Sequence, residues 1–339
     1  MNKTYDTVII DAETMRSTFN RILIECGFSE LNAAKCAEIF TKNTLDGVFS
    51  HGVNRFAKFV NYVKAGYVVP EAVPSVRGRF GSVEQWDGNL GPGPLNASRA
   101  TERAIEISAE YGMGMVAMAN TNHWMRGGTY GWQAALKGFV FLGWTNTMAN
   151  MPAWGATDPH LGNNPLVIAV PWNDTAIVLD FAMSQYSYGV LESYKNAGRM
   201  LPFPGGFSSK GELTDDPGKI LESWRSLPIG YWKGSSLSLL LDILASILSG
   251  GLSVHEISKS KSEYSLSQVF IALNIRGLTN FPAINDAVGK IIADLHRSIP
   301  VNESARVRYP GEDCSSIRHE HERNGIPVSW KIWKEIEKL

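Results

Sequence analysis

The stretch FSHGVNRF, residues 49–56, places a titratable imidazole and a guanidinium close together. Ser50, His51 and Gly52 interrupt one helical pattern, and a second pattern begins just before Arg55. Side chains four residues apart share one helix face, so His51 and Arg55 are expected to point the same way. A helix beginning near Ser50 would use that serine as its cap, and its dipole would lower the imidazole pKa. The pair suits proton transfer beside a bound carboxylate, although a capping turn with a surface histidine has the same pattern.

A second group of polar side chains follows the apolar run MGMVAMAN, residues 113–120. Asn122, His123 and Arg126, in the phrase NHWMRGG, would then lie at the carboxyl end of a buried strand. Ligands of α/β proteins usually bind at this end of the strands. A binding loop is one interpretation, and a structural loop whose glycines only set backbone angles is the other.

Two further polar residues stand in apolar surroundings. Asp180, in VLDFAMS, is expected to be buried, and a buried carboxylate must be paired or neutral. It could orient His51, bind a ribose hydroxyl or form an internal salt bridge. Lys233, in YWKGSS, opens an apolar helix whose free amides could hold an anion, or it marks an ordinary helix start.

The elements that must position these residues alternate between helix and strand, which favours an α/β fold. The longest apolar run, 237–248, is too short to span a bilayer and predicts a buried helix. Apolar periodicity predicts helices over 12–70 (broken at Ser50), 97–110, 234–249 and most of the chain after 285, and strands within 82–88, 113–120, 139–146, 165–171, 175–182 and 268–275.

Several motifs are missing from the chain. It has no G-x-G-x-x-G between a strand and a helix and no Walker A motif, which disfavours a Rossmann or P-loop enzyme. His319 and His321 form an H-x-H, but helix geometry would turn their rings about 200° apart. We therefore expect no metal site.

The composition limits the partners and the location. Of 339 residues, 44% are hydrophobic and 19% charged, which is typical of a globular protein. A formal net charge of −1 leaves no basic surplus for nucleic acid. The three cysteines have no zinc-like spacing, and the N-terminus shows no signal-peptide pattern. We expect a cytoplasmic protein with no membrane or nucleic-acid partner.

Taken together, a series of phrases resembles one family in order and spacing. That family is the type 2 malate/L-lactate dehydrogenase group of NAD(P)-dependent 2-oxoacid reductases. The resemblance covers nearly the whole chain and implies a non-Rossmann α/β fold, with a central mixed sheet and flanking helices, in a homodimer. The phrases are SHGVNRF, QWDGNLGPGPLN, NHWMRGGTYGWQAA, GNNPLVIAVP, VLDFAMS, MLPFPGG, LPIGYWKGSSLS and RYPGED.

The resemblance also implies roles for individual residues. His51 matches the proton donor, and Asp180 matches a position near the active site that could assist it. Ser50, Arg55, Asn122 and His123 match positions near the substrate. NADH, with NADPH as an alternative, would contact Ala176, Ile177, Val178, Leu179, Asp180, Phe181, Ala182, Trp232, Lys233, Gly311, Glu312 and Asp313.

The chain departs from the family pattern at two places near the expected nucleotide. It has Gly162-Asn163-Asn164-Pro165 where relatives usually have Gly-Thr-Asn-Pro, and Lys233-Gly234-Ser235-Ser236 where they often have Lys-Gly-Ser-Gly. Both changes lie close to the expected nucleotide region and leave the implied fold and chemistry intact.

Within the family, the chain is most similar to reductases of an open-chain 2-oxo sugar acid. The alternatives are a malate, lactate or ureidoglycolate type of dehydrogenase and a cyclic imino-acid reductase. A non-catalytic sensor of a sugar acid or nucleotide is the alternative outside enzymes. The resemblance implies three portions: a helical catalytic portion (1–75), a central cofactor-binding α/β portion (76–282), and a helical C-terminal portion (283–339) packed on the first.

Overall fold

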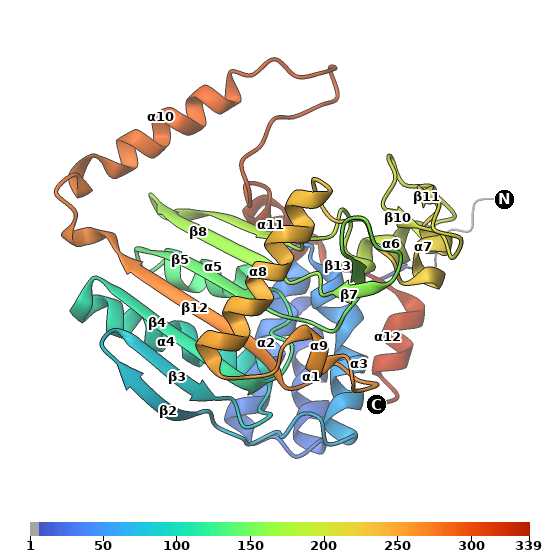
Figure 1. Ribbon diagram of the computed structural model, residues 1–339, viewed down its shortest axis with the longest axis horizontal. Coiled ribbons are helices and arrows are strands. Elements are labelled where there is room, and N and C mark those ends of the chain that lie inside the picture. The colour runs from blue at the N-terminus through green and yellow to red at the C-terminus, as the bar shows by residue number, and fades with distance from the viewer. Residues whose placement is uncertain (1–6) are drawn as a thin grey trace.

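A seven-stranded mixed sheet forms the centre of the computed structural model, which describes residues 7–339 (Figure 1). Only β3 and β4 run parallel, and the other neighbouring strands are antiparallel. This mixed sheet with flanking helices confirms the predicted fold class. The strands, in their order across the sheet, are β2 (Ser75–Phe80), β3 (Val83–Asp87), β4 (Met113–Thr121), β12 (Leu266–Asn274), β5 (Phe139–Thr145), β8 (Leu166–Trp172) and β9 (Thr175–Phe181).

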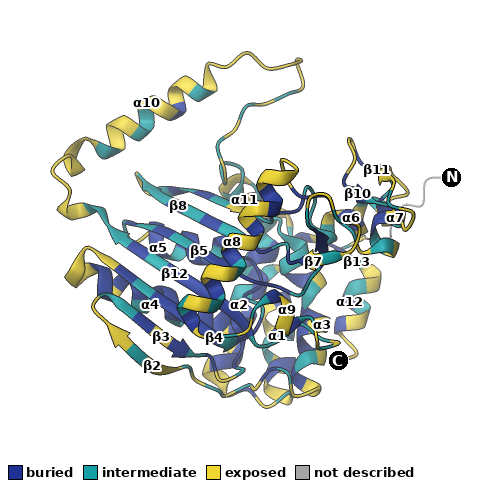
Figure 2. Ribbon diagram, in the orientation of Figure 1, coloured by how far each residue is buried: buried dark blue, intermediate teal, exposed yellow. Residues whose placement is uncertain are grey.

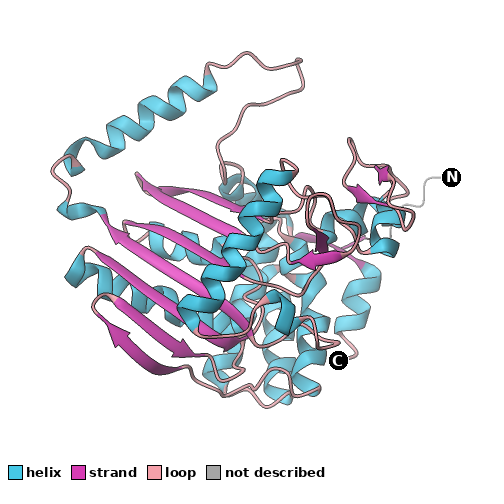
Figure 3. Ribbon diagram, viewed as in Figure 1, coloured by secondary structure: helices cyan, strands magenta, loops and turns pink. Residues whose placement is uncertain are grey.

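Helices cover both faces of this sheet (Figure 3). α4 (Gly93–Tyr111) and α5 (Gly128–Ala135) pack on one face, and α8 (Trp232–Ser249) packs on the other. In β4, Val116 and Met118 belong to the apolar core under α4 and α5, whereas Ala117 belongs to the core under α8. Alternate side chains thus enter opposite cores, which explains why this strand is an almost unbroken apolar run.

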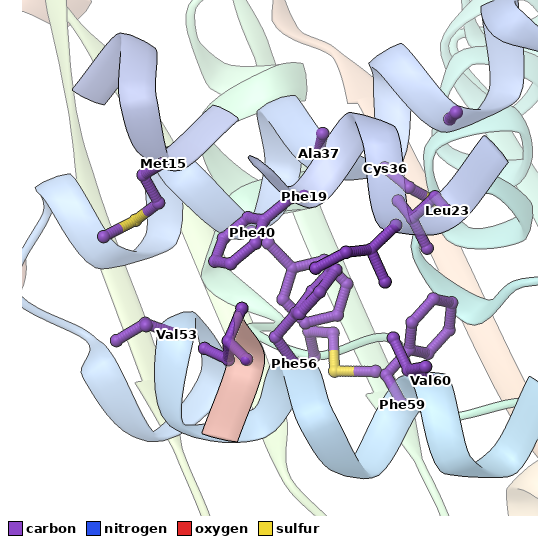
Figure 4. Packing of buried hydrophobic residues seen from close by; sticks show 14 of the residues in the cluster. Met15, Phe19, Leu23, Cys36, Ala37, Phe40, Val53, Phe56, Phe59 and Val60 are labelled. Atoms are coloured by element: carbon purple, nitrogen blue, oxygen red, sulfur yellow. The ribbon is translucent and has the colours of Figure 1, made fainter. Parts of the chain in front are cut away.

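A separate helical layer adjoins one end of the sheet. Its core is aromatic: Phe19 and Phe56 stack with ring centroids 4.0 Å apart, and Phe40 meets Phe56 edge-on at 5.2 Å (Figure 4). The C-terminus shares this core, since Ile326 and Trp333 are buried in it. The layer contains β1 (Thr7–Ile10), α1 (Ala12–Glu25), α2 (Glu30–Leu45), the 3-10 turn η1 (Phe49–His51), α3 (Val53–Lys64), β13 (Ile326–Ser329), which pairs antiparallel with β1, and α12 (Trp330–Ile336).

The break predicted at Ser50 is confirmed, but the predicted cap is wrong. Gly52, not Ser50, precedes α3, and the first N–H of that helix, from Val53, is accepted by the hydroxyl of Thr44 at 2.9 Å. Ser50 and His51 instead lie in η1. A Cβ at position 52 would overlap the hydroxyl of Thr44 on α2, so glycine is what lets η1 pack closely against α2.

The helix predicted over 237–248 is present, but the prediction that it is buried is wrong for a single copy of the chain. α8 lies on the sheet with one side and leaves a row of apolar side chains exposed on the other (Figure 2). A helix that is apolar on both sides cannot show from its own sequence how many sides are covered. The exposed residues are Leu237, Leu239, Leu240, Ile243, Leu244 and Ile247.

The remaining elements are short or peripheral. α10 (Ile284–His296) extends beyond the sheet edge and is mostly exposed (Figure 1). Among the described residues no helix is long and apolar enough to cross a membrane. The others are β6 (Met151–Pro152), β7 (Pro159–Leu161), α6 (Tyr188–Asn196), β10 (Gly206–Phe207), β11 (Leu213–Thr214), α7 (Pro217–Ser223), α9 (Val254–Ile257), η2 (Ile275–Gly277), η3 (Phe281–Ala283) and α11 (Cys314–Asn324).

Candidate active site

His51 is held at the junction of the helical layer and the sheet. Its backbone carbonyl accepts a hydrogen bond from Asn43 Nδ2 at 3.0 Å, and its Nδ1 lies 3.0 Å from Ser50 Oγ. A serine hydroxyl can donate to a neutral imidazole or accept from a charged one, so it holds the ring in both protonation states. Nε2 is then the nitrogen left for a ligand.

The imidazole of His51 is kept neutral near pH 7. Burial, followed by the positive charges of Arg55 and Arg126, lowers its pKa to about 4. The sequence predicted a lowered pKa through the dipole of a helix starting at Ser50. The direction is confirmed, but burial and the two arginines are the cause.

His123 stacks on His51, with ring centroids 5.8 Å apart. Its Nδ1 accepts the backbone N–H of Met125 at 3.0 Å. Burial and nearby positive charge hold the pKa of His123 well below its usual value. A neutral ring that accepts at Nδ1 carries its proton on Nε2, so His123 can donate a hydrogen bond from Nε2.

The side chain of Asn122 mainly stabilises the surrounding loops. Its Nδ2 donates to the carbonyls of Tyr67, Leu90 and Gly91, at 2.8–3.1 Å. Only the buried Oδ1 has no partner. The amide nitrogen is therefore committed to the loops, and the oxygen alone is left to interact with a ligand.

A small cavity lies beside His123. His123 and Asn122 line it, together with three charged side chains, whereas His51 is not a lining residue and adjoins the cavity through the ring of His123. Arg55 and Lys58 come from α3, and Glu263 comes from the loop before β12. The Arg55 Nη2 and Glu263 Oε1 atoms are 3.9 Å apart, which makes an ion pair without a hydrogen bond. The cavity thus places cations next to the proposed acid, as a carboxylate site requires.

Arg126 points away from this cavity. It forms an ion pair with the buried carboxylate of Asp46, whose other oxygen accepts Arg318 Nε at 2.6 Å. Its Nη2 also lies 3.3 Å from Cys314 Sγ. This buried cluster joins α2, the loop before α5 and α11, so Arg126 acts on His51 only through its charge.

Asp180 is not buried as the sequence suggested. It is exposed near the end of the edge strand β9, although it lies on the same face as the buried Ala176 and Val178, because residues two apart in a strand point the same way. Its Oδ2 accepts the backbone N–H of Gly128 at 2.7 Å, at the start of α5. Among the described residues, no hydrogen bond joins Asp180 to His51. The Nδ1 atom of His51 contacts Ser50 instead.

The free edge of β9 carries the turn that contains Gly311. Val178 donates its N–H to the carbonyl of Pro310 at 3.0 Å. Gly311 has φ +86°, and a Cβ there would lie 3.3 Å from the Val178 carbonyl. Two segments predicted to contact the dinucleotide, 176–182 and 311–313, are therefore side by side. The side chains of Glu312 and Asp313 are engaged in ion pairs with Arg306 and neighbouring residues.

Trp232 and Lys233 lie at the exposed start of α8. Ile229, just before this helix, donates its N–H to Met183 at 2.8 Å, which brings the helix start next to the end of β9. The expectation of free amides is wrong here, because Lys233, Gly234 and Ser235 donate their N–H groups to the carbonyls of residues 229–231. The Lys233 ammonium and the helix dipole remain as the attraction for an anion.

Sequence reasoning missed Lys58 and Glu263. Lys58 could have been found, because it lies three residues after Arg55 and so shares its face of α3. Glu263 carries no such signal, because its loop contacts the cavity only through the tertiary fold.

Comparisons with known proteins agree with this architecture. The family model described as malate/L-lactate dehydrogenase matches residues 10–337. A 2,3-diketo-L-gulonate reductase of Escherichia coli O6:K15:H31 is 43% identical over 328 residues, which is 96% of this chain and 98% of that protein.

Solved structures of the same kind are also similar. The malate dehydrogenase of Entamoeba histolytica superposes with a TM-score of 0.93 at 26% identity, covering 98% of this chain and 97% of that one. The delta1-piperideine-2-carboxylate reductase of Pseudomonas syringae pvar. tomato gives 0.86 at 25% identity, covering 98% and 99%. The predicted resemblance is confirmed: this chain belongs to the malate/L-lactate dehydrogenase family and is an oxidoreductase.

Proposed function

We propose that this enzyme uses NADH to reduce the C2 carbonyl of 2,3-diketo-L-gulonate, giving 3-keto-L-gulonate in the breakdown of a sugar acid. The observation that carries the proposal is the stacking of His51 on His123, which lines a cavity whose cations come from α3. The 43% identity to a 2,3-diketo-L-gulonate reductase supports this substrate over malate or a cyclic imine. The enzymes named for those two are only 25–26% identical.

His51 is the proposed proton donor to the oxygen of the C2 carbonyl. With a pKa of about 4 it is neutral in the free protein, so it must gain a proton as substrate binds. A carboxylate placed on Arg55 offsets the positive charge that helps to lower this pKa, and so favours the imidazolium. Nε2 then transfers its proton to the developing alkoxide, and Nδ1 keeps its contact with Ser50.

Arg55 and His123 are proposed to orient the substrate. The Arg55 guanidinium is planar and can bind a carboxylate through two parallel hydrogen bonds. His123 presents Nε2–H as a donor, which can hold the carbonyl oxygen or a hydroxyl. Asn122 can add only its Oδ1 as an acceptor.

The residues along β9 fit a nicotinamide dinucleotide, which supplies the hydride when bound. Gly311 packs its turn closely against β9, and a Cβ there would press on the carbonyl of Val178 at 3.3 Å. The exposed carboxylate of Asp180 can accept from a ribose hydroxyl, and the exposed ammonium of Lys233 can hold a phosphate. Since a carboxylate would repel a 2′-phosphate, we propose NADH before NADPH.

Loss of absorbance at 340 nm tests the proposal directly. NADH and NADPH would be supplied in parallel, with 2,3-diketo-L-gulonate, pyruvate, oxaloacetate or piperideine-2-carboxylate. We expect the fastest oxidation of NADH with diketogulonate. Oxidation with another of the acids alone would reassign the substrate, and dinucleotide binding without turnover of any acid would favour a sensor.

We further propose that the enzyme is a cytoplasmic homodimer. The three cysteines are free, which suits a reducing compartment. The exposed row on α8 includes Leu240 (54% exposed) and Ile247 (64% exposed), more apolar surface than a monomeric helix normally leaves uncovered. A second copy of the chain is the proposed cover.

Sedimentation velocity would test the dimer with the L240E/I247E double variant. We expect a dimer for the unmodified chain and a folded monomer for the variant, because two buried carboxylates would oppose the contact. The K290E/K334E variant, which changes exposed lysines elsewhere, serves as the control and should stay dimeric. Sedimentation of the unmodified chain as a monomer would contradict the proposed dimer.

A further inference from the structure

The cavity is lined by more charged side chains than a site for a single carboxylate needs. Arg55 alone could hold a carboxylate, yet Lys58 follows it by one turn on the same face of α3. Glu263 stands across from them with its side chain 17% exposed. The two histidines add no charge near pH 7, since both have lowered pKa values. The formal charge of the lining is therefore two positive and one negative.

Glu263 is held in place by hydrogen bonds that leave one of its carboxylate oxygens without a partner among the described residues. Its Oε2 accepts the backbone N–H of Met148 at 3.0 Å, and its own N–H lies 3.4 Å from the hydroxyl oxygen of Tyr62. Among residues 7–339, Oε1 makes no hydrogen bond, because Arg55 approaches it only to 3.9 Å. One carboxylate oxygen is thus fixed at the cavity wall as an unused acceptor.

The two cations are not fully neutralised by Glu263. Burial and the charge of Arg55 lower the pKa of Lys58, while Glu263 raises it. The Lys58 ammonium lies 5.6 Å from the ring centroid of Tyr62, and no carboxylate lies within ion-pair distance of it among the described residues. A net single positive charge remains in the cavity for a ligand.

We propose that Glu263 sets the specificity of this site, selecting a 2-oxo acid with one carboxylate and a hydroxylated chain and rejecting dicarboxylates. One carboxylate matches the single surplus positive charge, and a second would face Glu263 with no cation left. The free Oε1 accepts from a substrate hydroxyl, whereas a plain chain leaves it desolvated and unpaired. This inference rests on the proposed function, since it assumes that the cavity holds the substrate.

The test compares kcat/KM for three substrates in the unmodified enzyme and in Glu263→Gln. Glutamine keeps an acceptor for the Met148 amide and removes the negative charge. The substrates are 2,3-diketo-L-gulonate, pyruvate and oxaloacetate. We expect kcat/KM for oxaloacetate, relative to pyruvate, to rise at least about tenfold, because one repulsive charge is removed. The value for diketogulonate relative to pyruvate should fall about tenfold, because a charged acceptor is lost. Ratios between substrates on one protein do not change with the folded fraction.

Glu192→Gln is the matched control. Glu192 is exposed on α6 and acts on Lys58 only through its charge, without lining the cavity. This variant makes the same change in net charge. It should leave both kcat/KM ratios unchanged, that of oxaloacetate to pyruvate and that of diketogulonate to pyruvate. Equal ratios in Glu263→Gln and the unmodified enzyme would overturn the inference, and so would equal shifts in both variants.

A second measurement separates this inference from the proposed function. L-gulonate and L-malate, at equal concentrations, would be compared for their stabilisation of the protein against thermal unfolding. We expect L-gulonate to raise the Tm of the unmodified protein more than L-malate does, and Glu263→Gln to reverse that order. If no acid is reduced but this reversal occurs, the proposed function fails and the specificity of the cavity stands. If a 2-oxo acid is reduced but neither the order of Tm shifts nor the kcat/KM ratios change in Glu263→Gln, the proposed function stands and the inference about Glu263 fails.

Discussion

The cavity beside His51 and the edge of β9 are built in different ways. At and beside the cavity, three polar side chains are fixed by a neighbour: His51 by Ser50, His123 by the Met125 amide and Glu263 by the Met148 amide. Along β9, Asp180 and Lys233 are exposed, and the shape comes from backbone. Prepositioned side chains lower the cost of ordering a transition state, whereas a backbone surface binds through its shape. Single side-chain changes should therefore matter most in the cavity, and glycine changes should matter most at the edge.

The largest effect is expected from His51→Ala. Loss of a positioned general acid should lower kcat for diketogulonate reduction by about 10²–10⁴-fold. Binding of NADH, followed by quenching of protein fluorescence, should be unchanged, because the proposed dinucleotide contacts lie along β9.

His160→Ala is the control for this variant. His160 is an exposed histidine paired with Asp158, and its loss should leave the rate unchanged. A His51→Ala enzyme with the unmodified rate would remove His51 from its proposed role and, with it, the contrast between the two regions.

The pH dependence should give the next largest effect. Reduction needs a protonated His51, and the lowered pKa of about 4 makes that form scarce in the free enzyme above this pH. We expect kcat/KM for reduction to fall by up to about tenfold per pH unit from 5 to 7. Oxidation of the hydroxy acid needs the neutral imidazole, so its kcat/KM should be level over the same range.

Initial rates in both directions, at low substrate concentration, check this prediction. Arg55→Met should move the fall in kcat/KM to higher pH, because it removes one of the charges that lower the His51 pKa. A profile for reduction that is flat from pH 5 to 7 would contradict a neutral resting His51.

The smallest effect is expected at the edge of β9. Gly311→Ala would place a Cβ 3.3 Å from the Val178 carbonyl, at a φ of +86°. We expect the Kd for NADH to rise about tenfold through distortion of the turn, which corresponds to about 1.4 kcal/mol. Isothermal titration calorimetry would measure it.

Gly27→Ala is the matched control for the backbone strain. Gly27 also has a positive φ, +90°, but a Cβ there meets nothing within 4 Å. Its substitution should cost about 1 kcal/mol of stability and leave the Kd for NADH unchanged. Equal NADH affinity in Gly311→Ala and the unmodified protein would remove this turn from the proposed cofactor edge.

The sequence by itself determined the elements and the local geometry of the site. Apolar periodicity placed the helices around Ser50 and most strands of the sheet, because these patterns follow from a buried face. The i and i+3 spacing of Arg55 and Lys58 on α3 was visible for the same reason, but the predicted helix face shared by His51 and Arg55 is wrong, because His51 lies in η1. Resemblance of the motifs then identified the family, which the comparisons confirm.

The tertiary structure alone decided which distant residues meet. Glu263 reaches the cavity of α3 because the loop before β12 passes there, and Arg126 is paired with Asp46, which also binds Arg318. Asp180 lies inside an apolar run and shares a face with buried residues, yet it is exposed near the end of a strand at the edge of the sheet. The apolar outer side of α8 likewise depends on what covers the molecule. Such contacts join residues with no fixed spacing in the chain, so only the packing of the whole fold determines them.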